Sequence, residues 1–159
     1  MLRFTIFLLA VSIFACKPQK ETYYEANAKD SPTAAAPNNK PDNTVYYVFE
    51  NGTYVQSELD KKPEPVGGTS AFYRTMGAAI QYPAAARQRG IQGEVILTVI
   101  VNELGQAEEV QVTKRLGAGC DEAASNAWKK AAQNGFEPAM KGGKAVKVKY
   151  DVPVKFGLP

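Results

Sequence analysis

The chain has 159 residues, of which 45% are hydrophobic, and its formal net charge is +3. This length indicates one main domain, and a charge this small, without an arginine stripe among aromatic residues, argues against nucleic acid as a partner. The sequence contains no histidine, which excludes Ser-His triads, histidine acid–base catalysis and histidine metal ligands.

The N-terminus has the pattern of a secretory signal. Arg3 supplies a positive charge, and the apolar run from Phe4 to Ala15 is shorter than the ~20 residues that a membrane-spanning helix needs. A small residue directly before Cys16 resembles the processing site of bacterial lipoproteins. We therefore predict a signal peptide over residues 1–15 and a lipidated Cys16 that anchors the protein in a membrane. An ordinary cleaved signal and a short uncleaved anchor are the alternatives.

Residues 16–44 are predicted to form a disordered tether. They are rich in Lys, Asn, Ala and Pro and nearly lack aliphatic side chains, so they cannot bury enough apolar area to offset the entropy of ordering. Their relaxed span would be ~30 Å. The residue directly after Cys16 is Lys17 and not an acidic residue. This favours the outer membrane over the inner one, with the protein facing the periplasm.

A β-hairpin and linker are expected over residues 45–62. Asn51-Gly52 lies between two β-rich runs, which is the strongest short-range hairpin signal. The aromatic residues of this segment favour packing over a contact surface. A short amphipathic helix then follows over residues 71–79, with Phe72 and Met76 on its apolar face.

A second short helix is expected directly after Pro83, which suits a first helical turn. Three alanines follow as strong helix formers. Gly90 can adopt the left-handed conformation that ends a helix, and Gly93 can start a strand close to its neighbours.

Two strands and a longer helix come next. The strand over residues 94–101 has apolar residues on both faces, which predicts a central position. The returning strand covers residues 107–115. The helix over residues 116–135 has acids in its first turn, lysines near its end and Trp128 as its packing anchor. Cys120 is expected to be a small buried residue, although a helix N-terminus can also lower a thiol pKa and make the thiol reactive.

The last predicted strand covers residues 144–156, with valines and aromatics on one face and mostly lysines on the other. Pro153 cannot donate to a hydrogen-bond ladder, so it predicts an edge strand or an unpaired position. The lysines also suit an edge. An edge strand can accept a strand from a partner.

The element order predicts an α+β fold with two layers. A three-stranded antiparallel sheet would carry helices on one face, with the last strand beside the first, and the small β-hairpin would precede it.

An ordered series of motifs then resembles one family, the C-terminal domain of the TonB energy transducer. The match covers about residues 63–158, and the predicted domain spans residues 63–159. The motifs include QYPAAAR from Gln81, GIQG from Gly90, FEPA with Pro138, and VPVKF from Val152. The structural motif residues are Tyr82, Pro83, Gly90, Gly93, Trp128 and Pro138.

The resemblance implies a protein-binding module that catalyses nothing and uses no cofactor, metal or small-molecule substrate. In this family a peptide from a TonB-dependent outer-membrane receptor adds as a strand to the sheet, in energy-coupled transport across the outer membrane. By position, the residues that would meet such a peptide are Ala79, Ile80, Gln81, Val146, Val148, Tyr150 and Val152. The alternative for the valines and Tyr150 is plain sheet core.

The chain departs from a TonB transducer because it shows no inner-membrane spanning helix and no long Pro-rich arm. A second interpretation is therefore a lipid-anchored envelope adaptor that self-associates, for example as a homodimer, or attaches to the cell wall without transmitting force. An enzyme is the least favoured class, because no nucleophile motif, paired carboxylates or phosphate-binding loop is present.

Overall fold

The computed structural model describes residues 44–158. The predicted signal peptide, Cys16 and nearly all of the predicted tether lie outside the described residues. The elements are β1 Tyr46–Glu50, β2 Thr53–Gln56, β3 Glu64–Pro65, α1 Thr69–Ala79, α2 Ala84–Gln88, β4 Gly93–Val101, β5 Ala107–Lys114, α3 Cys120–Ala131, a 3-10 turn Ala132–Asn134, β6 Phe136–Glu137, β7 Ala139–Lys141, β8 Lys144–Val146 and β9 Val148–Phe156.

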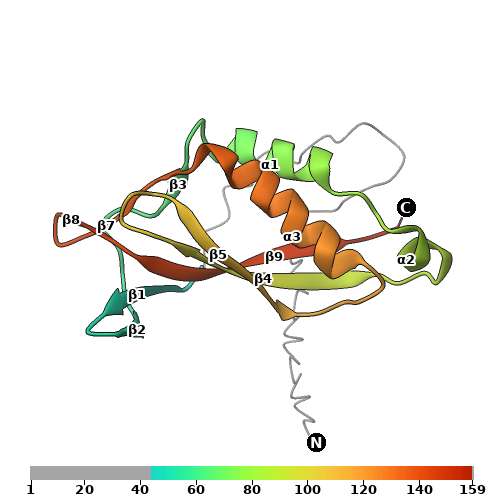
Figure 1. The fold of residues 1–159 in the computed structure, drawn as a ribbon, viewed down its shortest axis with the longest axis horizontal. Coiled ribbons are helices and arrows are strands. Elements are labelled where there is room, and N and C mark those ends of the chain that lie inside the picture. Colours follow the sequence, from blue (N-terminus) through green and yellow to red (C-terminus); the bar gives the residue numbers. More distant parts are fainter. Residues whose placement is uncertain (1–43, 159) are drawn as a thin grey trace, which may run out of the picture.

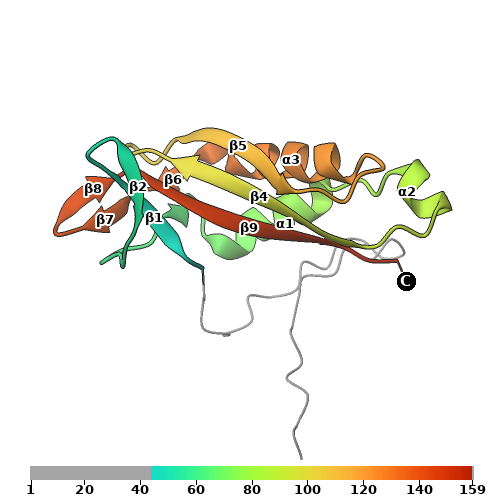
Figure 2. The same cartoon turned by 90° about the horizontal axis from the view of Figure 1, so that it is seen from below.

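The main sheet is antiparallel and has the strand order β2-β1-β9-β4-β5. Helices α1 and α3 lie on one face of this sheet, and none of the described helices covers the other, open face (Figures 1 and 2). The predicted α+β class, the helices on one face and the last strand beside the first are confirmed. The sheet has five strands where three were expected, because the predicted hairpin β1–β2 joins the sheet through β9.

The last predicted strand is divided in two, which corrects its expected bounds. Lys144–Val146 forms β8 and pairs with β7. After Lys147 the chain continues as β9 and pairs with all of β4, from Gly93 opposite Phe156 to Val101 opposite Val148. The two parts have different partners: the tight Gly142-Gly143 turn, with both glycines at positive φ, folds β8 back onto β7, whereas β9 pairs with β4.

The expected edge position of this last strand is correct for only part of its length. Strand β1 pairs with β9 at Val148, Lys149 and Tyr150. That part of β9 is therefore interior to the sheet. From Asp151 to Phe156 no described strand pairs with the outer side of β9.

The core lies between the sheet and the two longer helices. Val95, Leu97, Val99 and Val101 of β4 are fully buried, as their alternation predicted. Trp128 is 1% exposed and contacts the rings of Phe72 and Phe136, with centroids 6.1 and 5.9 Å away. The prediction that Trp128 is a packing anchor is confirmed.

The short helix α2 ends as its sequence predicted. Gly90 has φ of 63°, and the Ile91 N–H donates to the Ala86 carbonyl at 2.9 Å. This six-residue closure is the hydrogen bond of a Schellman motif. It turns the chain from α2 directly into β4.

Two small pairings, β3 with β6 and β7 with β8, were not predicted. Gly105, in the turn between β4 and β5, lies against the first of them. The Phe136 N–H donates to the Gly105 carbonyl at 2.7 Å, and a Cβ atom on Gly105 would lie 1.8 Å from the Phe136 carbonyl oxygen. Only glycine fits this contact.

The start of α3 is fixed by Asp121. Its carboxylate accepts from the N–H groups of Leu116 and Gly117 at 2.8 and 3.2 Å, so it holds the preceding loop in addition to facing the helix dipole. Cys120 is fully buried, as expected, and burial raises the pKa of its thiol. A raised pKa disfavours the thiolate, which argues against the reactive alternative.

Candidate partner-strand site

The side of β9 that no described strand pairs is the main candidate for binding. It runs from Asp151 to Phe156, beside the place where β1 ends its pairing at Tyr150. The pairing of β4 with the other side of β9 has no register shift. This half-edge is therefore regular backbone that can continue the sheet.

The direction of the backbone groups on this edge follows from one hydrogen bond. The Phe49 N–H donates to the Lys147 carbonyl at 2.9 Å, so the Lys147 carbonyl points towards β1. Successive residues of a strand direct their hydrogen-bonding groups to opposite sides. The groups of Lys149, Asp151, Pro153 and Lys155 therefore point to the outer side, and those of the residues between them point to β4.

Pro153 supports this assignment independently. It lies opposite Ile96 within the β4–β9 ladder. Because proline has no N–H, it disrupts a ladder least where its nitrogen faces away from the paired strand. The backbone groups of Pro153 therefore face away from β4.

The helix-covered side of this half-edge is apolar. Val152, Val154 and Phe156 are at most 6% exposed. The half-buried Tyr82 ring meets the Phe156 ring edge-on at 5.6 Å, and its hydroxyl donates to the Ile91 carbonyl. Partial burial raises the pKa of the Tyr82 hydroxyl. In the view of Figure 2, α1 crosses behind β9 and part of the helix is visible beyond the strand.

The three predicted site residues before Tyr82 lie at the end of α1. Ala79 is the last helical residue, and the Ile80 N–H donates to the Met76 carbonyl at 3.0 Å. Both side chains are half-buried against the core. Gln81 is exposed in the connection to Pro83, which precedes α2.

The four predicted strand residues have different surroundings. Val146 lies in β8 opposite Ala139. Val148 and Val152 are buried in the core, and Tyr150 is half-buried beside Tyr46, with ring centroids 5.2 Å apart. The backbone groups of Val148, Tyr150 and Val152 point to β4, so they contribute apolar support to the site. Pro138, a motif residue, is half-buried between β6 and β7.

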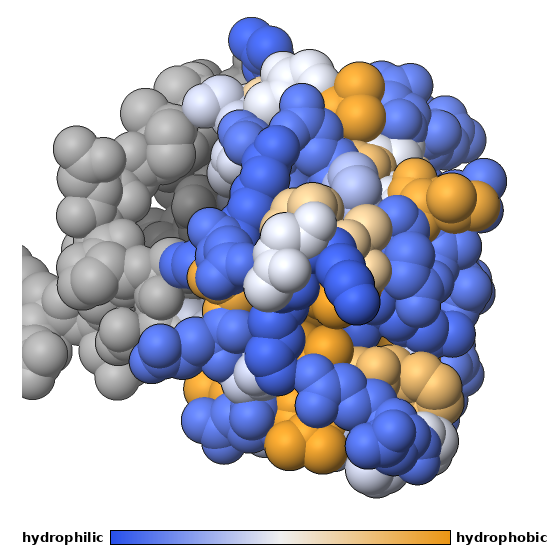
Figure 3. Space-filling model, turned by 90° about the vertical axis from the view of Figure 1, so that its left-hand side faces the viewer, coloured by the Kyte–Doolittle hydropathy of each residue, from blue (hydrophilic) through white to orange (hydrophobic). Residues whose placement is uncertain are grey.

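Charged and aromatic side chains lie on the open face next to this half-edge. The Thr98 hydroxyl donates to Asp151 at 2.5 Å. Lys149 Nζ lies 5.5 and 4.4 Å from the ring centroids of Tyr47 and Tyr54. Seen from the hairpin end, exposed apolar residues form separate groups on a mainly hydrophilic surface (Figure 3).

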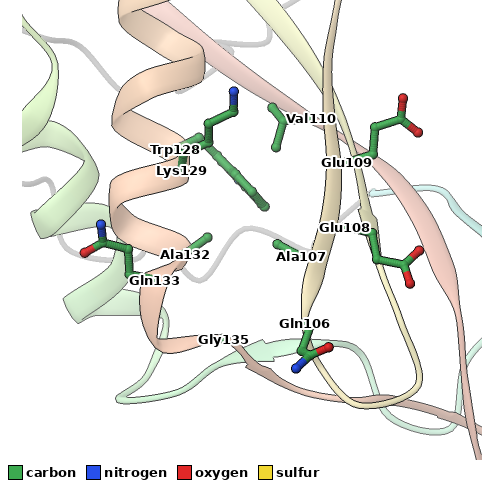
Figure 4. A pocket seen from close by; sticks show the side chains of 10 residues that line it. All are labelled: Gln106, Ala107, Glu108, Glu109, Val110, Trp128, Lys129, Ala132, Gln133 and Gly135. Carbon is green, nitrogen blue, oxygen red and sulfur yellow. The ribbon is translucent and has the colours of Figure 1, made fainter.

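A pocket between β5 and α3 was not predicted from the sequence. Its volume is ≈ 540 Å³, and it opens beside the second edge of the sheet (Figure 4). Its lining comes from two short segments, residues 106–110 and 128–135, and no local sequence pattern predicts that they enclose a pocket. Its lining residues are Gln106, Ala107, Glu108, Glu109, Val110, Trp128, Lys129, Ala132, Gln133 and Gly135.

The site thus consists of a strand edge that no described strand pairs, beside a layer of helices, and extended peptides add to sheet edges in several domain families. Among residues 44–158 there is no group of three or more metal-ligating side chains and no helix long and apolar enough to cross a membrane. The family model for the Gram-negative bacterial TonB protein C-terminal matches residues 78–158. The chain belongs to this family.

Two kinds of relatives accompany this match. Protein tonB2 of Pseudomonas aeruginosa is 41% identical over 81 residues, which is 50% of this chain and 29% of that protein. The chain thus aligns with less than a third of that relative. Two solution NMR structures of the Helicobacter pylori TonB-CTD are 28% and 27% identical, with TM-scores of 0.41 and 0.39. They cover 58% and 52% of this chain, and 86% and 85% of their own.

Proposed function

We propose that this protein is a lipid-anchored TonB-type docking module. It binds a peptide of a TonB-dependent outer-membrane receptor by strand addition to β9, in energy-coupled transport. The observation that carries the proposal is the outer side of β9 beyond Tyr150, which no described strand pairs and which lies inside the segment that matches the family. Backbone hydrogen bonds would give affinity, and the flanking side chains would give selectivity.

The backbone directions of β9 make a sharp test possible. An added strand bonds to the edge through every second residue of its backbone. A receptor peptide that is N-methylated at the residues facing β9 loses those bonds, whereas the same peptide N-methylated at the residues between them keeps them. The proposal predicts that one of these two alternate methylation patterns weakens binding, by about tenfold for one hydrogen bond, and that the other pattern does not.

The measurement is binding of the full-length protein to synthetic N-terminal peptides of TonB-dependent receptors, unmodified and in the two methylated forms. Equal affinities for the two methylated forms would contradict strand addition. Binding to isolated cell wall without binding to any receptor peptide would instead support the envelope adaptor.

The lipid anchor is proposed from the sequence before Cys16. The family is a family of cell-envelope proteins, and this agrees with an anchor in a membrane. Cys16→Ala should release the protein from the membrane fraction, because the acyl chains would no longer be attached. Separation of inner and outer membranes would locate the wild-type protein, with the outer membrane expected. A Cys16→Ala protein that stays in the membrane would contradict the anchor.

A further inference from the structure

The outer side of β5 forms the second edge of the main sheet. β5 is the last strand in the strand order, and no described strand pairs with this side. Its pairing with β4 has two register shifts, which leave Glu108 and Thr113 as extra residues near its two ends. Residues 109–112 between them pair one to one with β4. An exposed strand edge is a template for pairing with another chain.

The backbone groups that point outward from this edge belong to Val110 and Val112. The groups of Tyr150 on β9 point to β4, and its partner there is Val99, whose groups therefore point back to β9. Val99 lies opposite Val110 on β5, so this pair is not hydrogen-bonded and the groups of Val110 point outward. The same holds for Val112, two residues further along the strand.

A second copy of the chain fits this edge in an antiparallel arrangement about a two-fold axis. An axis perpendicular to the sheet keeps the helices of both copies on the same face, so residues opposite each other must have side chains on the same face. Centred on Gln111, this arrangement sets Val110 of each copy opposite Val112 of the other, as hydrogen-bonded pairs. A centre on Val110 or Val112 would instead bring Glu108 or Lys114, which lie outside the regular stretch, into the pairing.

The charges along β5 fit a second copy of the same strand. Glu108 and Glu109 lie near its beginning, Lys114 lies at its end, and all three side chains are exposed. In the antiparallel arrangement, the acidic end of each copy faces the basic end of the other, which stabilises the pairing. Glu108 already contacts Lys147, and Lys114 contacts Glu94 at 3.2 Å, so the second copy would extend these ion pairs into networks.

The helix side of this edge is apolar and incompletely filled. The side chains of Val110 and Val112 are half-buried against the core. Val110 also lines the ≈ 540 Å³ pocket, with Ala107 and Ala132 as small neighbours, and its side chain points towards α3 (Figure 4). In the two-fold arrangement, Val112 of the second copy lies beside Val110 at the open side of this pocket. The contact thus removes apolar surface from water.

We propose that β5 is a self-association surface, on which two copies of the chain join their sheets into one continuous antiparallel sheet. Gln111 lies at the two-fold axis, opposite its counterpart in the second copy. The contact is small, so the dimer is expected to be weak. It gives the homodimer considered from the sequence a definite surface and register. The inference does not rest on the proposed function, because β4 separates β5 from β9 in the sheet.

Single cysteines test the register. Gln111 opposite itself is a non-hydrogen-bonded pair with a Cα separation of ~4.5 Å, which a disulfide spans. The full chain with Gln111→Cys should therefore form a linked dimer in oxidised cell envelopes, seen by non-reducing electrophoresis. Glu109→Cys or Thr113→Cys alone should not, because each lies ~13 Å from its own counterpart. Coexpression of these two variants should restore the linked dimer. The wild-type chain, with Cys16 and the fully buried Cys120, shows the background.

A charge substitution tests the affinity. Gln111→Lys sets two positive charges opposite each other at the axis and should weaken dimerisation about fivefold. Gln56→Lys is the matched control, because Gln56 is an exposed residue of β2 at the far edge of the sheet. The measurement is sedimentation equilibrium of the full-length proteins in one detergent, at up to about 0.5 mM protein, with circular dichroism as the folding control.

The outcomes are distinguishable. Equal linking of the three single-cysteine variants would overturn the proposal, because random collisions do not depend on register. A wild-type protein that stays monomeric at all concentrations, together with no linking of Gln111→Cys, would also overturn it. Equal weakening by Gln111→Lys and Gln56→Lys would assign the dimer to another surface and contradict the role of β5. A loss of receptor-peptide binding would affect only the proposed function.

Discussion

At the scale of single residues, Gly105 is the position where backbone geometry leaves least freedom. Its φ of 76° lies in the left-handed region. Its carbonyl accepts from Phe136, and the space where a Cβ atom would lie is filled by the Phe136 carbonyl. The turn between β4 and β5 is thereby held against β6, next to the ring of Trp128.

Gly105→Ala should lower the free energy of unfolding by more than about 3 kcal/mol, because a backbone group must move to admit the methyl group. Gly142→Ala is the matched control. Gly142 also has a left-handed φ, of 58°, but nothing lies within 4 Å of the position that an added Cβ atom would take. Gly142→Ala should therefore lower the free energy of unfolding by only about 1 kcal/mol. Urea unfolding of both variants measures the difference, and equal losses would contradict the contact.

The ion pair between Glu108 and Lys147 gives a pH prediction. The hydrogen bond from Lys147 lowers the pKa of Glu108 below its ordinary value of 4.5, and a bond from Asn102 adds to this. A carboxyl whose pKa is lowered by folding stabilises the fold above its unfolded pKa and loses this effect as the pH falls through its folded pKa.

Glu108→Gln should therefore be less stable than wild type at about pH 7, and the gap should close towards about pH 3. Thermal unfolding of the two proteins across this range measures it. Added salt should also narrow the gap near neutral pH, because both side chains are partly exposed. A gap of constant size from neutral to acid pH would contradict the role of the carboxylate.

At the scale of secondary-structure elements, the hairpin β1–β2 carries a prediction of its own. Val48→Ala should cost about 2 kcal/mol of unfolding free energy, because it removes apolar side-chain volume from a fully buried position opposite Val148 of β9. Val55→Ala, on the neighbouring strand and 46% exposed, should cost less than about 0.5 kcal/mol. Chemical denaturation compares them, and a small loss for both would indicate a hairpin that is not seated on the sheet.

The elements with strong local patterns could be predicted from the sequence. The Asn51-Gly52 turn, the Gly90 helix end and the alternation of β4 each depend on neighbours in the chain. The attachment of the hairpin to β9 joins residues about a hundred positions apart, and no local pattern encodes that pairing. The two-residue strands β3 and β6 could not be predicted for the same reason, because each is formed only by pairing with the other.

The candidate site was predictable only in part. Pro153 indicated an edge, and no described strand pairs with the outer side of β9 beyond Tyr150. The alternation of valines drew attention to Val148 and Val152, because apolar side chains are visible in a sequence. The direction of backbone N–H groups is not visible in a sequence, because it depends on which strand pairs with each side of β9.

At the scale of the whole molecule, residues 44–158 share one continuous core. The main sheet extends from the hairpin to β5, and its buried residues form one cluster with those of α1 and α3. Contacts of this kind favour an all-or-none transition.

Trp128, the only tryptophan in the chain, therefore reports on the whole fold. Its fluorescence and the far-ultraviolet circular dichroism should change with coincident midpoints during urea unfolding. Hydrogen exchange of the Phe49 amide, which pairs β1 with β9, should require the same opening free energy. Separate midpoints, or faster exchange at Phe49, would show that the hairpin opens first.

The position of β1 has a mechanical consequence. The chain enters the described fold at Thr44, directly before β1, and β1 holds β9 through three residue pairs. A peptide docked from Asp151 onwards would share that same strand. Tension between a membrane anchor and a docked receptor would then pass along β9 alone and leave the helices, β4 and β5 outside the path of the force. The short ladder between β1 and β9 would be the first part of the protein to yield, well before the nine-residue ladder between β4 and β9.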